Sequence, residues 1–190
     1  MNTKAIFIPG YHGAGEDILS AKHKMWFVWL KKKLEELGLE VIAKDYPDAY
    51  LCRAQYWLPF IKTLGADENT VLIGHSTGAI AAMRFAEENK ILGSVFVGSY
   101  YTDLGDPEEK ASGYFDNLWQ WKKIKNNQKW IIQFHSTDDP WISNEEAHMV
   151  HQMLGTELYE YHDRGHFGAN KSYLEFPELL EAIKKKLNII

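Results

Sequence analysis

Short apolar runs alternate along the chain with longer stretches in which apolar residues recur at helical spacing. Runs bounded by glycine, proline or polar residues predict strands at 5–8, 39–43, 71–73, 94–97, 130–134 and 157–161. Apolar residues three and four positions apart predict helices at 25–37, 53–64, 79–89, 144–154 and 173–187. Pro59 lies inside the second of these helical segments and should kink or split it.

This alternation predicts an α/β fold, a three-layer sandwich with a central, mostly parallel sheet of about six strands. No repeat, linker or change in composition divides the sequence, so we expect residues 1–190 to form a single domain. Parallel sheets bind ligands beyond the carboxyl ends of their strands. Catalytic residues should therefore come directly after strands.

The strand at 71–73 leads into Gly74-His75-Ser76-Thr77-Gly78, and a helical pattern rich in small residues follows at once. Gly-x-Ser-x-Gly between a strand and a helix is the nucleophile-elbow pattern, in which small neighbours relieve a strained turn. The bare pattern also occurs in ordinary turns, so the interpretation depends on this context. It predicts that Ser76 is an exposed nucleophile and that the N–H of Thr77 can bind an oxyanion.

Carboxylates follow one later strand and histidines follow the next. Asp138 and Asp139 come after the strand at 130–134, and His162 and His166 come after the strand at 157–161. The order of nucleophile, acid and histidine is that of α/β-hydrolases. The sequence therefore predicts a Ser-His-Asp triad.

Local residues favour one member of each pair. Gly165 gives His166 a close-approach position that His162 lacks, so His166 is the preferred base. Pro140 restricts Asp139 to an extended backbone, which suits a carboxylate held in one pose. Asp138 is better placed to cap the turn through its own backbone.

Two further segments are expected to shape the site. The glycine-rich loop after the first strand contains Tyr11 and His12, and an N–H near Tyr11 is the expected second oxyanion donor. The connection from 99 to 129 is too long for a plain loop and is rich in aromatic residues, which could wall a substrate pocket or anchor the segment to the sheet. The residues that we expect to line the pocket are His12, Trp57, Tyr100, Tyr114, Trp119, Trp141 and Phe167.

Several stretches resemble the small serine hydrolases typified by retinoblastoma-binding protein 9, and the resemblance covers nearly the whole chain. The matching stretches are Gly74-His75-Ser76-Thr77-Gly78-Ala79, Trp57-Leu58-Pro59-Phe60, Ala111-Ser112-Gly113-Tyr114-Phe115, Trp119-Gln120-Trp121, Ser136-Thr137-Asp138-Asp139-Pro140 and Gly165-His166-Phe167. The resemblance implies a compact α/β-hydrolase without a separate cap domain. It also implies a triad of Ser76, Asp139 and His166.

The chain departs from this family at two places. Tyr11 and His12 stand where the family carries small residues after Pro-Gly, which affects the second oxyanion donor. The family's pocket-protein tag, Leu-x-Cys-x-Glu, corresponds here to residues 64–68, with Ala66 in place of the cysteine. We therefore expect weak or no binding to a retinoblastoma-type pocket protein.

Charge and cysteine content exclude several classes of partner and site. A net charge of −5 argues against nucleic acid or an anionic membrane as partner. Cys52 is the sole cysteine, so no disulfide forms, and no signal peptide or membrane-spanning run is visible. A cytoplasmic or nuclear location is expected. His148 and His151 have ligand-like spacing but no third ligand nearby, so no metal site is expected.

Taken together, these features predict a serine hydrolase that needs no metal or organic cofactor. It should cleave a small acyl substrate, a carboxylic ester, thioester or amide, through an acyl-enzyme intermediate. The first alternative is a non-catalytic protein-interaction module on a hydrolase fold. The second is a flavodoxin-like nucleotide binder, which the absence of a Gly-x-Gly-x-x-Gly turn after the first strand disfavours.

Overall fold

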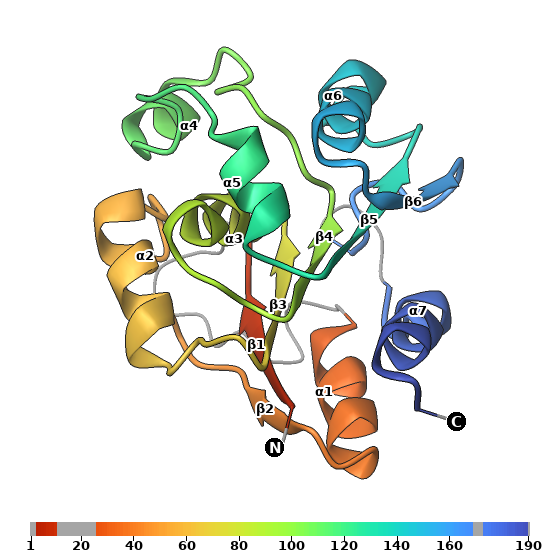
Figure 1. The fold of residues 1–190 in the computed structure, drawn as a ribbon. Helices are drawn as coiled ribbons and strands as arrows, with labels where there is room; N and C mark the ends of the chain where they lie inside the picture. Colours follow the sequence, from red (N-terminus) through yellow and green to blue (C-terminus); the bar gives the residue numbers. More distant parts are fainter. Residues whose placement is uncertain (1–2, 11–25, 169–172, 190) are drawn as a thin grey trace.

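A twisted sheet of parallel strands forms the centre of the molecule (Figure 1). The computed structural model describes residues 3–10, 26–168 and 173–189. The strand order is β2-β1-β3-β4-β5-β6, and every pair is parallel. The strands are β1 (Lys4–Ile8), β2 (Glu40–Ile42), β3 (Thr70–His75), β4 (Gly93–Val97), β5 (Trp130–Ser136) and β6 (Glu157–Tyr161).

Helices cover both faces of the sheet, which confirms the predicted three-layer α/β architecture (Figure 1). The helices are α1 (Phe27–Glu36), α2 (Ala54–Thr63), α3 (Thr77–Glu88), α4 (Pro107–Ala111), α5 (Trp121–Asn126), α6 (Asn144–Leu154) and α7 (Pro177–Leu187). Helices α1 and α7 pack on one face, while α2, α3, α5 and α6 pack on the other. Residues of β3 alternate between the two cores, with Leu72 in one and Val71 and Ile73 in the other.

Some element boundaries differ from those predicted. Pro59 lies within α2 and does not split it. The last helix starts at Pro177, because proline suits the first helical turn, where its missing N–H has no partner to lose. Strand β5 extends to Ser136, so His135 and Ser136 belong to the strand and the candidate acids begin the loop after it.

The strand order reverses between β1 and β3, and this reversal fixes the place for a site. Successive connections run from β1 outward to β2, then back to β3 and onward to β6. In open parallel sheets, ligands bind beyond the carboxyl ends of the strands at such a reversal. Ile8 at the end of β1 pairs with Gly74 near the end of β3, which places the loops after these two strands at one level. No helix of the described residues is long and apolar enough to cross a membrane.

Candidate active site

A sharp turn between β3 and α3 carries Ser76. Its backbone angles, φ 54° and ψ −126°, lie in a region that residues with side chains rarely occupy, as expected of a nucleophile elbow. A Cβ on Gly74 would lie 2.4 Å from the carbonyl oxygen of Gly78, and one on Gly78 would lie 2.1 Å from that of Ile8. Neither position can hold a side chain, so both glycines of the motif are sterically required.

His166 and Asp139 form a buried hydrogen-bonded pair at the ends of β6 and β5. His166 Nδ1 lies 2.7 Å from Asp139 Oδ2. The other carboxylate oxygen accepts the backbone N–H groups of Trp141 and Ile142, at 3.0 and 3.1 Å. Burial raises the pKa of Asp139, but the hydrogen bonds from His166 and these amides outweigh it and hold the pKa below its usual value. The structure therefore presents an ionised carboxylate to the inner nitrogen of His166.

Asp138 points elsewhere. Its Oδ1 accepts the Ser136 hydroxyl at 2.6 Å and the N–H of Gly165 at 2.8 Å. The bond to Ser136 joins two side chains of the turn, whereas the sequence predicts that Asp138 caps the turn through its own backbone. The bond to Gly165 was not predicted, and it reaches the loop that carries His166.

Gly98, directly after β4, is a site residue that the sequence analysis did not identify. Its φ of +62° is in the left-handed region, and a Cβ there would lie 3.0 Å from His166 Cε1. A glycine at the end of a predicted strand was the available signal. It lets the backbone pass closely beneath the imidazole ring.

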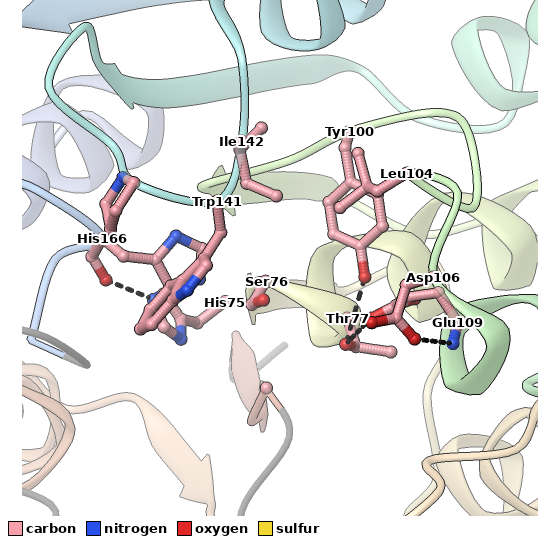
Figure 2. Close-up of a pocket in the computed structure, with 12 residues that line it drawn as sticks. His75, Ser76, Thr77, Tyr100, Leu104, Asp106, Glu109, Trp141, Ile142 and His166 are labelled. Carbon is pink, nitrogen blue, oxygen red and sulfur yellow. Dashed lines mark hydrogen bonds between the residues drawn. The ribbon is translucent and has the colours of Figure 1, made fainter.

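Ser76 and His166 border a cavity of about 440 Å³ at the carboxyl edge of the sheet. Figure 2 shows Ser76 near its middle, with His166 and Trp141 on one side and Thr77, Tyr100 and Glu109 on the other. The lining residues are Gly10, His75, Ser76, Thr77, Tyr100, Leu104, Asp106, Glu109, Pro140, Trp141, Ile142 and His166. The Trp141 ring meets the His166 ring edge-on, with centroids 4.9 Å apart.

Of the residues expected to line the pocket, Tyr100 and Trp141 do so, whereas four others lie elsewhere. Trp57 is buried, and its indole N–H donates to the Pro47 carbonyl. Trp119 stacks beneath the Arg84 guanidinium, 3.7 Å from its carbon to the ring centre. The remaining two, Tyr114 and Phe167, are buried in the core clusters. Tyr11 and His12 lie outside the described residues.

Glu109, in α4, is a second unpredicted wall residue. Its Oε1 lies 3.3 Å from Thr77 Oγ1, which is in turn 3.1 Å from the Tyr100 hydroxyl (Figure 2). Burial raises the pKa of Glu109, despite the hydrogen bonds from Tyr100 and Thr77. Helix α4 has only five residues, and its sequence pattern is too short to predict which side chain faces a cavity.

The other candidate ligands and nucleophiles lie apart from this cavity or have structural partners. Among the described residues, no group of three or more His, Cys, Asp or Glu side chains could hold a metal ion. His148 pairs with Glu160, and His151 lies 2.9 Å from the Thr156 hydroxyl. The Cys52 thiol is buried, and burial raises its pKa, which makes it unreactive.

Known proteins match the sequence over nearly its whole length. The serine hydrolase family profile matches residues 5–185. The chain is 46% identical over 187 residues to the rat (Rattus norvegicus) serine hydrolase RBBP9, covering 97% of this chain and 96% of the relative. The chain belongs to the serine hydrolase family.

The fold of this serine hydrolase is similar to that of solved structures. The Bacillus subtilis ydeN gene product has a TM-score of 0.85 at 22% identity, covering 98% of this chain and 100% of that one. The Rhodococcus esterase RhEst1 has a TM-score of 0.62 at 12% identity, covering 98% and 90%. Both share the α/β-hydrolase fold, and the family assignment makes this chain a hydrolase.

Proposed function

We propose that this serine hydrolase cleaves a small carboxylic ester, thioester or amide through an acyl-enzyme formed on Ser76. The observation that carries the proposal is the buried His166–Asp139 pair, whose histidine lines the same cavity as the elbow serine. A non-catalytic interaction module would have no need for such a pair beside a half-buried serine that lines a cavity. Buried charged groups are costly, which favours a chemical role.

In the proposed reaction, Ser76 Oγ attacks the substrate carbonyl carbon as His166 takes the hydroxyl proton. Asp139, bonded to Nδ1, fixes the tautomer in which Nε2 can accept that proton, and it stabilises the imidazolium that forms. His166 then gives the proton to the departing alcohol, thiol or amine. A water molecule, deprotonated by His166, releases the acid and restores Ser76.

The negative oxygen of the intermediate needs donors near the start of α3. Thr77 is the first residue of this helix, so its N–H has no partner within the helix and lies at the positive end of the helix dipole. We assign one oxyanion contact to this N–H. The second remains the predicted N–H near Tyr11.

The size and lining of the cavity favour a small, partly apolar substrate. Its volume of about 440 Å³ is near the lower end for small-molecule sites. Leu104, Trp141 and Ile142 supply apolar wall, and Thr77, Tyr100 and Glu109 supply polar groups at one end. Such a lining accepts a short acyl chain and holds it in one orientation.

A fluorophosphonate probe tests the proposal directly. The probe should label the wild-type protein at Ser76, and Ser76→Ala should abolish labelling and turnover of short acyl esters while the fold remains. Ser112→Ala is the matched control, because Ser112 borders a smaller neighbouring cavity and is not part of the proposed triad. Labelling that persists in Ser76→Ala would refute the assignment of the nucleophile.

A further inference from the structure

The loop that carries the proposed base, residues 164–167, belongs to no helix or strand. Gly165 and Phe167, on either side of His166, have φ angles of 53° and 51°, in the left-handed region. Such a backbone is strained at Phe167, because a residue with a side chain rarely adopts this conformation. We refer to this segment as the base loop. Within the loop, the N–H of Phe167 donates to the carbonyl of Arg164 at 3.1 Å and closes a turn, and side chains from outside bind four further backbone groups.

Each residue of the base loop has one backbone group bound by a side chain from another part of the chain. Two side chains accept backbone N–H groups: Ser136 Oγ accepts that of Arg164 at 3.1 Å, and Asp138 Oδ1 accepts that of Gly165 at 2.8 Å. Two side chains donate to backbone carbonyls: His75 Nε2 donates to that of His166 at 2.9 Å, and Trp26 Nε1 donates to that of Phe167 at 3.1 Å. The contacts come from β3, from the end of β5 and its loop, and from the residue before α1.

Two of these contacts come from the chain neighbours of the other proposed triad members. His75 directly precedes Ser76 and binds the base loop at His166 itself. Asp138 directly precedes Asp139 and binds the residue before His166. We infer that His75 and Asp138 are positioning residues, which hold His166 in the correct position relative to Ser76 and Asp139.

His75 is suited to this role because it can act only as a neutral donor. The ring is buried, and burial, together with the nearby His166, lowers its pKa to about 3. A neutral ring with its proton on Nε2 donates to the His166 carbonyl without adding a charge beside the proposed base. The centroids of the two rings lie 4.8 Å apart, so replacing the His75 ring should change the surroundings of the His166 ring (Figure 2).

The competing explanation is that these bonds only satisfy buried polar groups. That explanation predicts a loss of stability on substitution and no specific loss of turnover. Positioning predicts that kcat falls much more than KM, since substrate binding is kept while the base is displaced. The inference rests on the proposed function for its kinetic part.

His75→Phe removes the donor and keeps a ring, and we expect kcat for a short p-nitrophenyl ester to fall about 10- to 100-fold at equal folded fraction. His75→Gln can place an amide N–H near the position of Nε2 and should recover most of this loss. His135→Phe is the matched control, because His135 is also fully buried near a strand end and its Nε2 is bonded to Asn144 instead. An equal loss of kcat in both Phe variants would overturn the inference.

The same comparison applies to Asp138. Asp138→Ala removes the acceptor for Gly165, whereas Asp138→Asn keeps a carbonyl oxygen that can accept the same N–H. Turnover should fall clearly further in the Ala variant than in the Asn variant. Equal turnover in the two would contradict the role of Asp138, even if a His75 variant failed to fold.

A readout that does not need activity separates the two proposals. The proton shared by His166 and Asp139 gives a downfield NMR signal when the pair is held firmly, and we expect it to broaden or shift in His75→Phe but not in His135→Phe. If wild-type Ser76 is never labelled and this signal still responds to His75, the proposed function fails and the positioning role stands. If Ser76 is labelled and neither kcat nor the signal responds to His75, the positioning role fails alone.

Discussion

At the scale of single residues, the adjacent carboxylates of this site have different partners. Successive side chains near a strand end point in different directions, so Asp139 and Asp138 cannot reach the same atom. Asp139 meets His166, and Asp138 meets the backbone of the next loop. The sequence favours Asp139 as the partner of His166 because Pro140 disfavours a helical backbone at the residue before it.

Asp139→Asn should therefore lower kcat by about 10⁴-fold, the loss measured for the equivalent change in a serine protease. An amide can donate a proton to Nδ1 and so favour the wrong tautomer of His166. Asp138→Asn should instead cost about 1 kcal/mol in the free energy of unfolding, with a far smaller effect on kcat. Ester turnover and urea unfolding of both variants check this, and an inactive Asp138→Asn enzyme with an active Asp139→Asn enzyme would reverse the assignment.

Gly98 offers a second residue-scale prediction, with a matched control in Gly105. Both glycines have left-handed φ angles, +62° and +73°, but a Cβ on Gly105 would meet nothing within 4 Å. Alanine at either position should cost roughly 1–2 kcal/mol in stability through backbone strain. Only Gly98→Ala should also reduce kcat, because its methyl group would press on the His166 ring. Equal kcat in the two variants would show that the ring can move without loss of turnover.

At the scale of elements, the segment between β4 and β5 contains aromatic residues with two different roles. Its aromatic residues were rightly expected to serve either as pocket wall or as anchors, but their spacing does not distinguish the two. Tyr100 lines the cavity because it lies three residues after the end of β4, at the carboxyl edge of the sheet. Trp119 is an anchor because the Arg84 side chain of α3 lies over its ring, a contact between residues far apart in sequence. Only the packing of the segment on α3 decides the role of each residue.

The turn between α2 and β3 contains the tag-like residues 64–68 and carries an element-scale prediction. Helix α2 ends at Thr63, Leu64 packs against the core, and Lys4 Nζ donates to the Gly65 carbonyl at 2.7 Å. Binding as an extended peptide would require this turn to unfold locally, and Ala66 lacks the thiol that the tag requires. We predict no binding to a retinoblastoma-type pocket domain at micromolar concentrations by calorimetry. Tight binding that Leu64→Ala abolishes would contradict this.

At the scale of the whole molecule, the order of strands and helices could be predicted because each element carries its own pattern. The elbow, the two candidate acids and the two candidate histidines could be placed on one edge, because parallel strands bring their carboxyl ends together. The side-chain hydrogen bonds that hold the backbone of the base loop could not be predicted. They come from Trp26, His75, Ser136 and Asp138, which become neighbours only when β3, β5 and α1 are assembled. The spacing of residues along the sequence does not predict such contacts between distant segments.

Burial of the His75 ring makes the stability of the whole fold depend on pH. His75 has a pKa of about 3 in the folded chain, against about 6.5 unfolded, with His166 and Asp139 facing it. Above pH 6.5 neither state binds a proton there, so its contribution to stability is complete. Between pH 6.5 and about 3 only the unfolded chain binds the proton, and the free energy of unfolding falls by up to about 1.4 kcal/mol per pH unit.

Carboxyl groups with shifted pKa values modify this trend at lower pH, and two of them, Asp139 and Glu109, lie at the site. The lowered pKa of Asp139 makes its contribution complete above its unfolded value and lost as pH falls through its folded value. The raised pKa of Glu109 acts in the opposite direction, since the folded chain holds that proton more tightly. Urea unfolding of the wild type and His75→Gln between about pH 7 and pH 5 isolates the histidine, because the variant should show a much shallower slope. Identical slopes would mean that His75 is protonated in the folded chain, and it could not then be the neutral donor that holds the base loop.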